Sequence, residues 1–350
     1  MPCIAIFRTG GIGDVILSTV ALKIIQDLQP HTELHWFGRQ PTLELIRTAF
    51  PSVHTHEFLP GASYRQNIHL VKSAATRFDL IIDLQRSART IVIGSLCSVY
   101  FGCAYVTWNK YSMERSMFVF QSLLKKRQLL HKTASLPRRH EAMAARVISA
   151  LKQQKLLSDD LKFTTGQPEI PVPNPTKKNA IAINLGVLYK SKELPFDKWQ
   201  ELINHIRLRQ CCQEVYFLGD QKQFELAEKL IVCLGKQILG QNYCGKTSLS
   251  EAAQLLAACT CTLTNDSALS HLSESVGTPV IVFFGPTHEQ FGYRPFLKES
   301  KSISLPLSCR PCTKGGLTNC RFGDFKCFHD LDMQLAIKQI NQLTNCEPAS

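Results

Sequence analysis

The stretch Thr262–Thr287, TLTNDSALSHLSESVGTPVIVFFGPT, decides the fold. An apolar segment runs into a polar turn at Thr264–Ser267, and a short helix is predicted to follow over about Ser267–Val276. A glycine and a proline end that helix, and the β-branched and aromatic run Val280–Phe284 predicts a buried strand. The order strand, turn, helix, strand is the repeating unit of an α/β protein.

The predicted helix start is a candidate anion site. A side-chain oxygen of Asp266 or Ser267 can accept from the unpaired amides of the first turn and cap the helix. Unpaired amides and the helix dipole attract negative charge to such a position. The simpler alternative is one more βαβ unit with no ligand, because capped helices are common.

The alternation of strands and helices occurs twice and predicts two Rossmann-like domains with parallel sheets facing across a cleft. Residues 1–163 form the first predicted domain and residues 180–330 the second, and the Pro-rich segment Thr164–Asn179 is predicted to link them. Residues 331–350 contain an amphipathic segment, Asp332–Leu343, which we expect to return to the first domain as a helix. Five predicted strands, besides the one above, are Cys3–Phe7, Glu33–Phe37, Asp79–Leu84, Ala180–Leu185 and Glu214–Leu218.

The composition of the chain indicates which classes of binding partner suit it. The 350 residues carry a net charge of +12, which suits a polyanionic partner such as nucleic acid, an anionic membrane face or a phosphorylated glycolipid. A merely soluble basic protein is the alternative. Several of the 14 cysteines lie inside apolar segments, which indicates a reducing compartment. The N-terminus runs directly into a strand, so we expect no signal peptide.

One uncharged segment, Thr90–Asn109, is long enough to raise the question of a membrane span. Its small and polar residues and the break at Tyr100–Gly102 favour a helix followed by a buried strand.

The loop Arg8–Asp14 is rich in glycine and precedes a predicted helix. Gly11 and Gly13 begin a dinucleotide-binding pattern, but Ile16 occupies its third glycine position, and no GK[ST] follows for a phosphate loop. The loop therefore lets the backbone approach a ligand and presents Asp14 at a helix start. The alternative is that Asp14 only stabilises the first turn of the helix.

The two ends of the chain resemble one family. The run Asn265–Leu272, then Gly277–Pro279 and Phe284–Thr287, resembles the C-terminal signature of glycosyltransferase family 9, the ADP-heptose:lipopolysaccharide heptosyltransferases. Ala268 stands where that family usually has glycine. Gly13-Asp14, followed by Leu-Ser-Thr and Ala-Leu, is similar to its N-terminal signature, in which the acid is the catalytic base.

The resemblance implies a GT-B fold and an inverting transfer of heptose from ADP-heptose to the inner core of lipopolysaccharide, on a lipid A–Kdo or heptosyl acceptor. It implies no cofactor for catalysis, an ADP-sugar donor, an anionic glycolipid acceptor and no nucleic acid. We accordingly expect a cytoplasmic protein, with peripheral contact at the cytoplasmic face of the bacterial inner membrane.

The resemblance also assigns donor residues. Lys192 lies in Lys-Glu-Leu-Pro, similar to the family's Lys-x-Trp-Pro, with Leu194 in place of Trp. The resemblance therefore predicts that Lys192 is the cation that binds the nucleotide diphosphate. Without the resemblance, the sequence would predict an ordinary surface lysine. The other expected donor-binding residues are Glu225, Asp266, Ser267, Ala268, Leu269 and His271.

Gly13, Arg86 and Arg89 are the expected acceptor-binding residues. The two arginines follow a predicted strand, and guanidinium groups bind carboxylates and phosphates through paired donors. Solvated charges at a helix end are the alternative. Two further basic clusters, Lys125–Arg127 and Arg138-Arg139, either touch anionic lipid headgroups or, as we favour, form a solvated face.

Four cysteines near the C-terminus, within residues 309–327, have the spacing of a tetrathiolate site: Cys309, Cys312, Cys320 and Cys327. Four thiolates can close a tetrahedron around zinc or iron, which would make any metal structural. Four reduced thiols or partial disulfides are the alternative. Similar cysteine patterns occur in a subset of the family, and iron is associated with some members that modify proteins.

Two rival functions stay open. One is a nucleotide-sugar glycosyltransferase that acts on a protein hydroxyl or another glycan. The other is a basic nucleic-acid-binding protein with a zinc knuckle, although the cysteine segment has few clustered basic residues and little aromatic interleaving.

Overall fold

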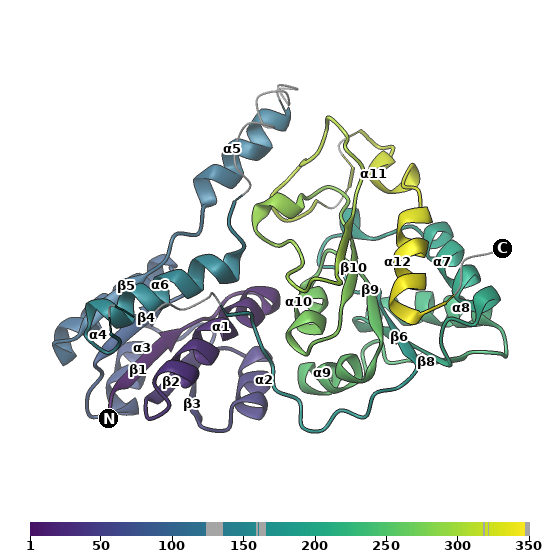
Figure 1. Ribbon diagram of the computed structural model, residues 1–350. Helices are drawn as coiled ribbons and strands as arrows, with labels where there is room; N and C mark the ends of the chain where they lie inside the picture. Colours follow the sequence, from purple (N-terminus) through teal and green to yellow (C-terminus); the bar gives the residue numbers. More distant parts are fainter. Residues whose placement is uncertain (124–135, 159, 161–165, 318, 321, 347–350) are drawn as a thin grey trace. The chain divides into compact units, whose positions relative to one another are not determined.

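The computed structural model describes residues 1–123, 136–158, 160, 166–317, 319–320 and 322–346. The chain forms two compact units (Figure 1). Unit 1 consists of Met1–Lys110 and Pro137–Pro171, and unit 2 of Tyr111–Leu136 and Val172–Ser350. The predicted basic cluster Lys125–Arg127 lies outside the described residues.

Unit 1 is built on a parallel five-stranded sheet in the order β3-β2-β1-β4-β5. Its strands are β1 (Cys3–Phe7), β2 (Glu33–Gly38), β3 (Val53–Glu57), β4 (Leu80–Asp83) and β5 (Ala104–Thr107). Its helices are α1 (Ile12–Leu28), α2 (Thr42–Ala49), α3 (Tyr64–Ala74), α4 (Ala88–Phe101) and α6 (Arg139–Gln153).

Unit 2 contains a parallel six-stranded sheet in the order β11-β10-β9-β6-β7-β8. Its strands are β6 (Ala180–Asn184), β7 (Glu214–Leu218), β8 (Leu239–Asn242), β9 (Cys261–Asn265), β10 (Val280–Phe283) and β11 (Lys301–Ile303). Its α-helices are α5 (Ser112–Leu123), α7 (Phe196–Arg209), α8 (Phe224–Leu234), α9 (Leu249–Ala258), α10 (Ala268–Ser275), α11 (Lys326–His329) and α12 (Gln334–Thr344). Among its described residues, short 3₁₀ turns are η2 (Lys190–Lys192), η3 (Gln221–Gln223) and η4 (Glu289–Phe291).

Both sheets have the doubly wound order of Rossmann folds, in which the strand order reverses once. The reversal falls between β1 and β4 in unit 1, and between β6 and β9 in unit 2. Ligands of such sheets bind outside the carboxyl ends of the strands at the reversal point. The loops after β1, β4, β6 and β9 are therefore the places to look for a site.

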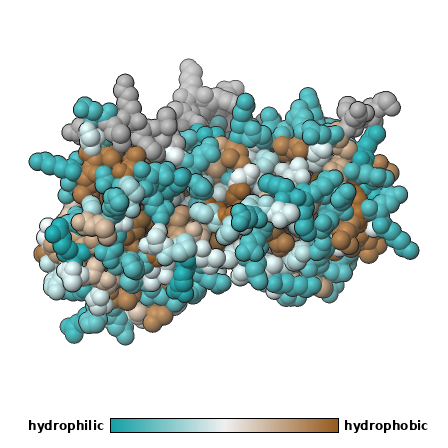
Figure 2. All heavy atoms as spheres, turned by 60° about the horizontal axis from the view of Figure 1, so that its bottom comes forward, coloured by the Kyte–Doolittle hydropathy of each residue, from teal (hydrophilic) through white to brown (hydrophobic). Residues whose placement is uncertain are grey.

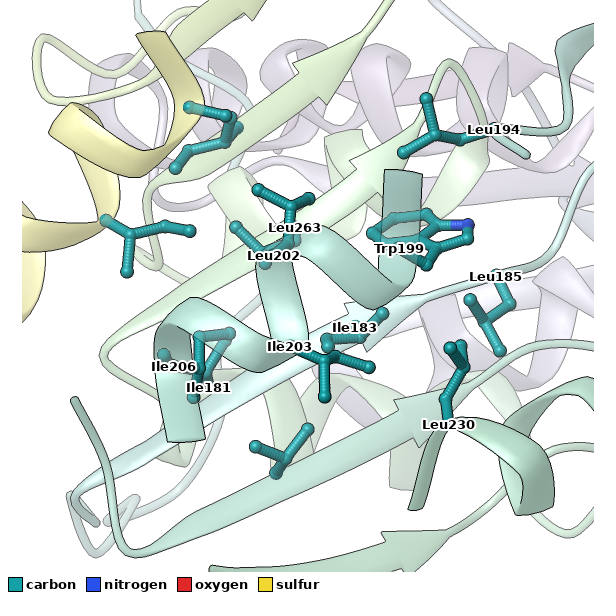
Figure 3. Packing of buried hydrophobic residues seen from close by; sticks show 14 of the residues in the cluster. Ile181, Ile183, Leu185, Leu194, Trp199, Leu202, Ile203, Ile206, Leu230 and Leu263 are labelled. Carbon is teal, nitrogen blue, oxygen red and sulfur yellow. The ribbon is translucent and has the colours of Figure 1, made fainter. Parts of the chain in front are cut away.

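The core of unit 2 shows how the sequence pattern builds a layer (Figure 3). Alternate β6 residues Ile181 and Ile183 point toward α7, whose Trp199, Leu202 and Ile203 cover them. All five side chains are fully buried. At about 25 cal/mol per Å² of apolar surface removed from water, such packing supplies much of the stability of the unit.

The uncharged segment at residues 90–109 forms the predicted helix and strand, although of the strand residues only Val106 is buried. Helix α4 ends at Gly102, which has the left-handed conformation with φ 64°, and β5 follows directly. Within the described residues, the structure contains no helix whose length and hydropathy would suit a membrane span. On the face shown in Figure 2, apolar side chains lie in small groups among hydrophilic ones.

The unit boundaries differ from the predicted domains in two places. Residues 111–136 belong to unit 2, because the Phe118 ring packs edge-on against Phe291 at 5.8 Å and Ser122 donates to the Pro311 carbonyl. Part of the predicted linker belongs to unit 1, where Ile170 is only 2% exposed.

The C-terminal helix also differs from its prediction. Helix α12 does not return to unit 1 but packs within unit 2, against α7, β9 and β11. Its apolar positions Ala336 and Ile340 are fully buried in the core of that unit. The amphipathic helix was correctly predicted, but Leu335 on it is 62% exposed, and the sequence could not identify the surface that the helix covers.

Candidate functional site

Asp14 lies in the first turn of α1, immediately after β1, and two arginines hold its carboxylate. Arg8 Nη2 is 3.0 Å from Oδ2, and Arg139 Nε is 2.9 Å from Oδ1. The arginine side chains are 1% and 5% exposed, whereas that of Asp14 is 27% exposed. The carboxylate is thus paired with two buried cations and remains partly accessible to a ligand.

Trp108 and the end of β4 orient both arginines. Arg8 Nη1 and Trp108 Nε1 donate to the same acceptor, the carbonyl of Leu84, at 2.5 and 2.8 Å. The Arg139 guanidinium lies over the Trp108 ring, 4.9 Å from its centroid. Stacking on an aromatic face suits the planar guanidinium and fixes the direction of its donors.

The loop after β4 is organised by Asp83, which is fully buried. Its Oδ1 accepts from the amides of Gln85 and Arg86 at 2.8 and 2.7 Å, and its Oδ2 accepts from the Tyr105 hydroxyl at 2.8 Å. Burial and the Asp83 carboxylate raise the pKa of Tyr105, so the phenol stays protonated and donates. Arg86 has a positive φ of 45°. The hydrogen bonds that the Gln85 and Arg86 amides donate to Asp83 hold that backbone conformation.

The three predicted acceptor residues differ in their positions and contacts. Arg86 is exposed, and its Nη1 donates to the Trp108 carbonyl at 3.3 Å, which places it at the Asp14 side of the loop. Arg89 instead donates to the Ala62 carbonyl at 2.5 Å, and its guanidinium lies over the Tyr64 ring. Gly13 lies inside the first turn of α1, which begins at Ile12, and not in the loop before it.

Two cations near Asp14 were missed as site residues. Arg139 was predicted to be part of a solvated basic face, but it is buried against Asp14, while its neighbour Arg138 pairs with Glu141. Lys110 is a second such residue, and its pKa is lowered to about 8 by burial and by the nearby Arg8. A short basic run carries no signal in sequence that separates a buried arginine from an exposed one.

In unit 2, the loops after β6 and β9 meet in an ion pair. Lys192 Nζ lies 2.7 Å from Oδ2 of Asp266 and donates to the Asp266 backbone carbonyl at 3.1 Å. The Thr287 hydroxyl donates to the same carboxylate oxygen at 2.6 Å. Both charged side chains are 13% exposed, so the pair is largely protected from water.

Two asparagines at the strand ends position this pair. Asn265 Oδ1 accepts from the Leu194 amide at 3.0 Å, which fixes the Lys192 loop to the end of β9. Asn184 Nδ2 donates to the Ser267 hydroxyl at 2.7 Å. Leu194 is 1% exposed and belongs to the same core as Trp199, so the leucine fills an apolar position (Figure 3).

The capping prediction at this helix is wrong. Helix α10 begins at Ala268 with Ser267 as its N-cap, but no side chain caps it. Ser267 is engaged by Asn184 and Asp266 by Lys192, so neither side-chain oxygen turns back to the first-turn amides. Ala268 and Leu269, in that first turn, are both partly exposed.

Two donor candidates, His271 and Glu225, lie on α10 and α8. His271 is 5% exposed, and its ring lies 5.8 Å from that of Tyr293. Glu225 lies in the first turn of α8 with an exposed side chain. Within the described residues, no hydrogen bond or ion pair joins Glu225 to Lys192 or Asp266.

Residues 70–320 match the family model of glycosyltransferase family 9 (heptosyltransferase), which is well over half of the chain. The chain belongs to glycosyltransferase family 9. A curated relative, lipooligosaccharide heptosyltransferase 2 of Haemophilus influenzae, is 31% identical over 136 residues, which is 37% of each chain. The chain thus matches about two fifths of the length of such relatives.

Solved structures agree on the fold. The structure of ADP-heptose lipopolysaccharide heptosyltransferase II of E. coli superposes with a TM-score of 0.69 at 18% identity, over 99% of both chains. This likeness shows the GT-B heptosyltransferase fold. TibC, a dodecameric iron-containing heptosyltransferase of enterotoxigenic E. coli solved with ADP-D-β-D-heptose, matches with a TM-score of 0.56 at 12% identity, over 98% of this chain and 76% of its own.

The cysteine-rich segment of this family 9 protein is packed against the donor-side loops. The buried Arg310 donates to the carbonyls of Gly285, Leu305 and Thr287, and the Cys312 amide donates to the Pro286 carbonyl at 2.8 Å.

On its other side, the segment binds the turn that carries Lys192. Leu317 and Ser191 exchange two hydrogen bonds, from the Leu317 amide to the Ser191 hydroxyl at 2.8 Å and from the Ser191 amide to the Leu317 carbonyl at 3.2 Å. The segment therefore connects the Lys192 turn with the turn that contains Thr287.

The four cysteines of this segment are free thiols in one neighbourhood. Burial and then the other three thiols raise the pKa of Cys312 to about 12. The described residues nevertheless place only one group of three possible metal ligands within 4.8 Å of one another, and it consists of Cys3, Glu33 and His35. The four thiols are thus gathered, but they are not at the spacing of a closed tetrahedral site.

Replacing Asp14 by Asn should destabilise unit 1, because it leaves two buried guanidiniums without their counter-ion. Breaking a buried pair costs about 3–5 kcal/mol, and the partial exposure of Asp14 reduces the expected loss to about 2 kcal/mol. Urea unfolding measures this loss. Asp27→Asn on the same helix is the matched control, since its pair with Lys23 is exposed and should change stability by less than about 0.5 kcal/mol. Equal stability of the two variants would contradict the ion-pair account.

Proposed function

We propose that this chain transfers heptose from ADP-heptose to an anionic acceptor of the lipopolysaccharide inner core, with inversion at the anomeric carbon. The observation that carries the proposal is a matched pair of half-sites at the two sheet reversal points. One is a carboxylate between Arg8 and Arg139, and the other is the Lys192–Asp266 pair beside the start of α10. Family membership and the names of the relatives support it.

Asp14 acts as the general base in this proposal. It accepts the proton of the attacking acceptor hydroxyl, and its partial exposure lets that hydroxyl come within hydrogen-bonding distance. The two guanidiniums keep it ionised and fix its orientation. One base is sufficient for a single displacement with inversion, because the leaving diphosphate departs without protonation.

Lys192 and the first-turn amides of α10 stabilise the departing ADP. The ammonium group has three N–H donors, and the contacts with the Asp266 carboxylate and carbonyl use two of them. The third is available to a phosphate oxygen, next to a helix start that favours negative charge. Charge that develops on the diphosphate is thereby stabilised.

Asp266 has a separate role. Its contacts with Lys192 and Thr287 both use Oδ2, so Oδ1 can accept from a hydroxyl group of the donor sugar. We assign Glu225, Ser267, Ala268, Leu269 and His271 to the same donor half-site, on the strength of the family signature.

On the acceptor side, Arg86 and Lys110 supply positive charge around Asp14, and we assign Gly13 to the same surface and Arg89 to a separate acceptor contact beside Ala62 and Tyr64. Carboxylates or phosphates of an inner-core glycolipid suit these donors. An acceptor of this kind lies at the cytoplasmic face of the inner membrane, where we place the protein as a peripheral enzyme.

We further propose that the four C-terminal thiols hold a structural zinc or iron ion. Four thiolates are the ligand set that both metals accept, and they leave no open position for catalysis. The hydrogen bonds of Arg310 and Leu317 connect this segment to both donor-side turns. Metal binding there would hold the donor half-site in one arrangement. The iron-containing TibC supports the assignment for a protein of similar fold.

The central test is transfer from ADP-heptose to lipid A–Kdo and to heptosylated acceptors. Asp14→Asn should lower turnover by about 100- to 10,000-fold, the usual contribution of a general base, while ADP binding is retained. Asp27→Asn should retain full activity, because its exposed pair lies elsewhere on α1. Undiminished turnover by Asp14→Asn would remove Asp14 from the mechanism. Transfer to a protein or another glycan alone would replace the proposed acceptor.

Lys192→Gln should weaken ADP binding by about 10- to 100-fold, since a hydrogen bond to a charged group contributes about 1.5–3 kcal/mol. Isothermal titration calorimetry measures the change at fixed ionic strength. Lys190→Gln is the matched control, because Lys190 lies in the same 3₁₀ turn with an exposed side chain. The assignment fails if both variants bind ADP as the wild type does, or if oligonucleotide is bound in preference to ADP.

The purified protein should retain about one equivalent of zinc or iron that depends on the C-terminal thiols. Cys309→Ser with Cys312→Ser should lose that equivalent and raise the KM for the donor, as measured by elemental analysis and kinetics. Cys233→Ser is the control, because it removes a partly exposed thiol outside the segment. Identical metal content in the two variants would show that the segment holds no metal.

A further inference from the structure

A second group of possible metal ligands lies in unit 1, at the amino ends of the strands. Cys3 is the first residue of β1 and Glu33 the first residue of β2, and the two are paired in register. His35 is two residues further along β2 and faces His54 on β3. Because strand residues alternate between faces, these four side chains project from the same face of the sheet.

Their donor atoms are close together. The ligand atoms of Cys3, Glu33 and His35 all lie within 4.8 Å of one another. Glu33 Oε1 is 3.0 Å from His35 Nε2 and 3.7 Å from His54 Nε2. One carboxylate oxygen therefore lies between two imidazole nitrogens, with a thiol beside it.

A fifth residue, His56, completes the arrangement. Its Nε2 lies 3.0 Å from His35 Nδ1, and the two rings are stacked at an interplanar angle of 1°. A histidine that binds a metal through Nε2 carries its proton on Nδ1 and usually donates it to a second residue, which fixes the ring. His56 Nε2 is in the position of that acceptor.

We propose that Cys3, Glu33, His35 and His54 form a zinc site that joins β1, β2 and β3, with His56 as the residue that orients His35. Sulfur, nitrogen and oxygen ligands together suit Zn²⁺, and four of them fill its tetrahedral coordination. A thiolate and a carboxylate balance the charge of the ion, which matters at a site where Cys3 and His35 are 5% and 2% exposed.

The proposed zinc site is structural, and it is separate from the two half-sites that contain Asp14 and Lys192. Asp14 and Arg86 follow the carboxyl ends of β1 and β4, and Asp83 is the last residue of β4, whereas Cys3 and Glu33 begin their strands. In a parallel sheet these are opposite edges. A metal that binds three adjacent strands would hold the edge strand β3 to the sheet.

The test uses full-length protein in which Cys309→Ser and Cys320→Ser prevent the C-terminal thiols from contributing. Buffered Zn²⁺ is titrated into this protein, and into derivatives that also carry Glu33→Gln, His54→Gln or His69→Gln. Glu33 and His54 side chains are 40% and 59% exposed, so their variants should fold. His69 is an exposed histidine on α3 and serves as the matched control.

We expect one equivalent of Zn²⁺ per chain, bound at least about 10-fold more weakly by Glu33→Gln and by His54→Gln, and unchanged by His69→Gln. With Co²⁺ as the probe, Cys3→Ser should abolish the thiolate-to-metal charge-transfer band while far-UV circular dichroism stays the same. Binding of Zn²⁺ with equal affinity by all the derivatives, or no binding at micromolar Zn²⁺, would overturn the proposal. The residues would then form only a hydrogen-bonded polar cluster.

Discussion

The parallel pairing of β1 with β4, and of β6 with β9, is the constraint on which the rest of the structure depends. In each pair the two strands run in the same direction at the point where strand order reverses, so their following loops emerge side by side. Arg8 follows β1 and accordingly reaches the Leu84 carbonyl after β4. Lys192, on the loop after β6, reaches Asp266 after β9 by the same geometry. Strand order thus brings the loops of each half-site together, and the side chains on those loops then determine its chemistry.

The sequence predicted the regular elements well because apolar strands and capped helices are local patterns. The strands at Cys3–Phe7 and Glu214–Leu218 were predicted with their observed bounds. The edge strand β3 was not predicted, since VHTHE has the polar composition that sheet edges tolerate. The path of α12 also could not be foreseen, because an apolar stripe does not identify its partner.

Single residues of the candidate site could be predicted from local motifs, but the contacts between them could not. Asp14 and Lys192 were recognised from local motifs, whereas Arg139 lies 125 residues from Asp14, and only the fold brings them together. The same limit applied to Asp266, whose neighbours suggested a helix cap until its contact with Lys192 was known. Long-range electrostatic partners leave no periodic signal, because a single charged residue carries no information about its distance to another.

The two half-sites differ in net charge, and the difference suits the role proposed for each, binding of the acceptor in unit 1 and of the donor in unit 2. Asp14 with Arg8 and Arg139 carries a net charge of +1 by simple addition, and Lys110 adds to it when protonated. Under the proposed function, this excess would attract an anionic acceptor. The charges of Lys192 and Asp266 instead cancel, so under the proposed function the diphosphate would be attracted by the remaining ammonium donor and the backbone amides of α10. In the proposed reaction, the ion pair would hold Lys192 in position to stabilise the leaving group.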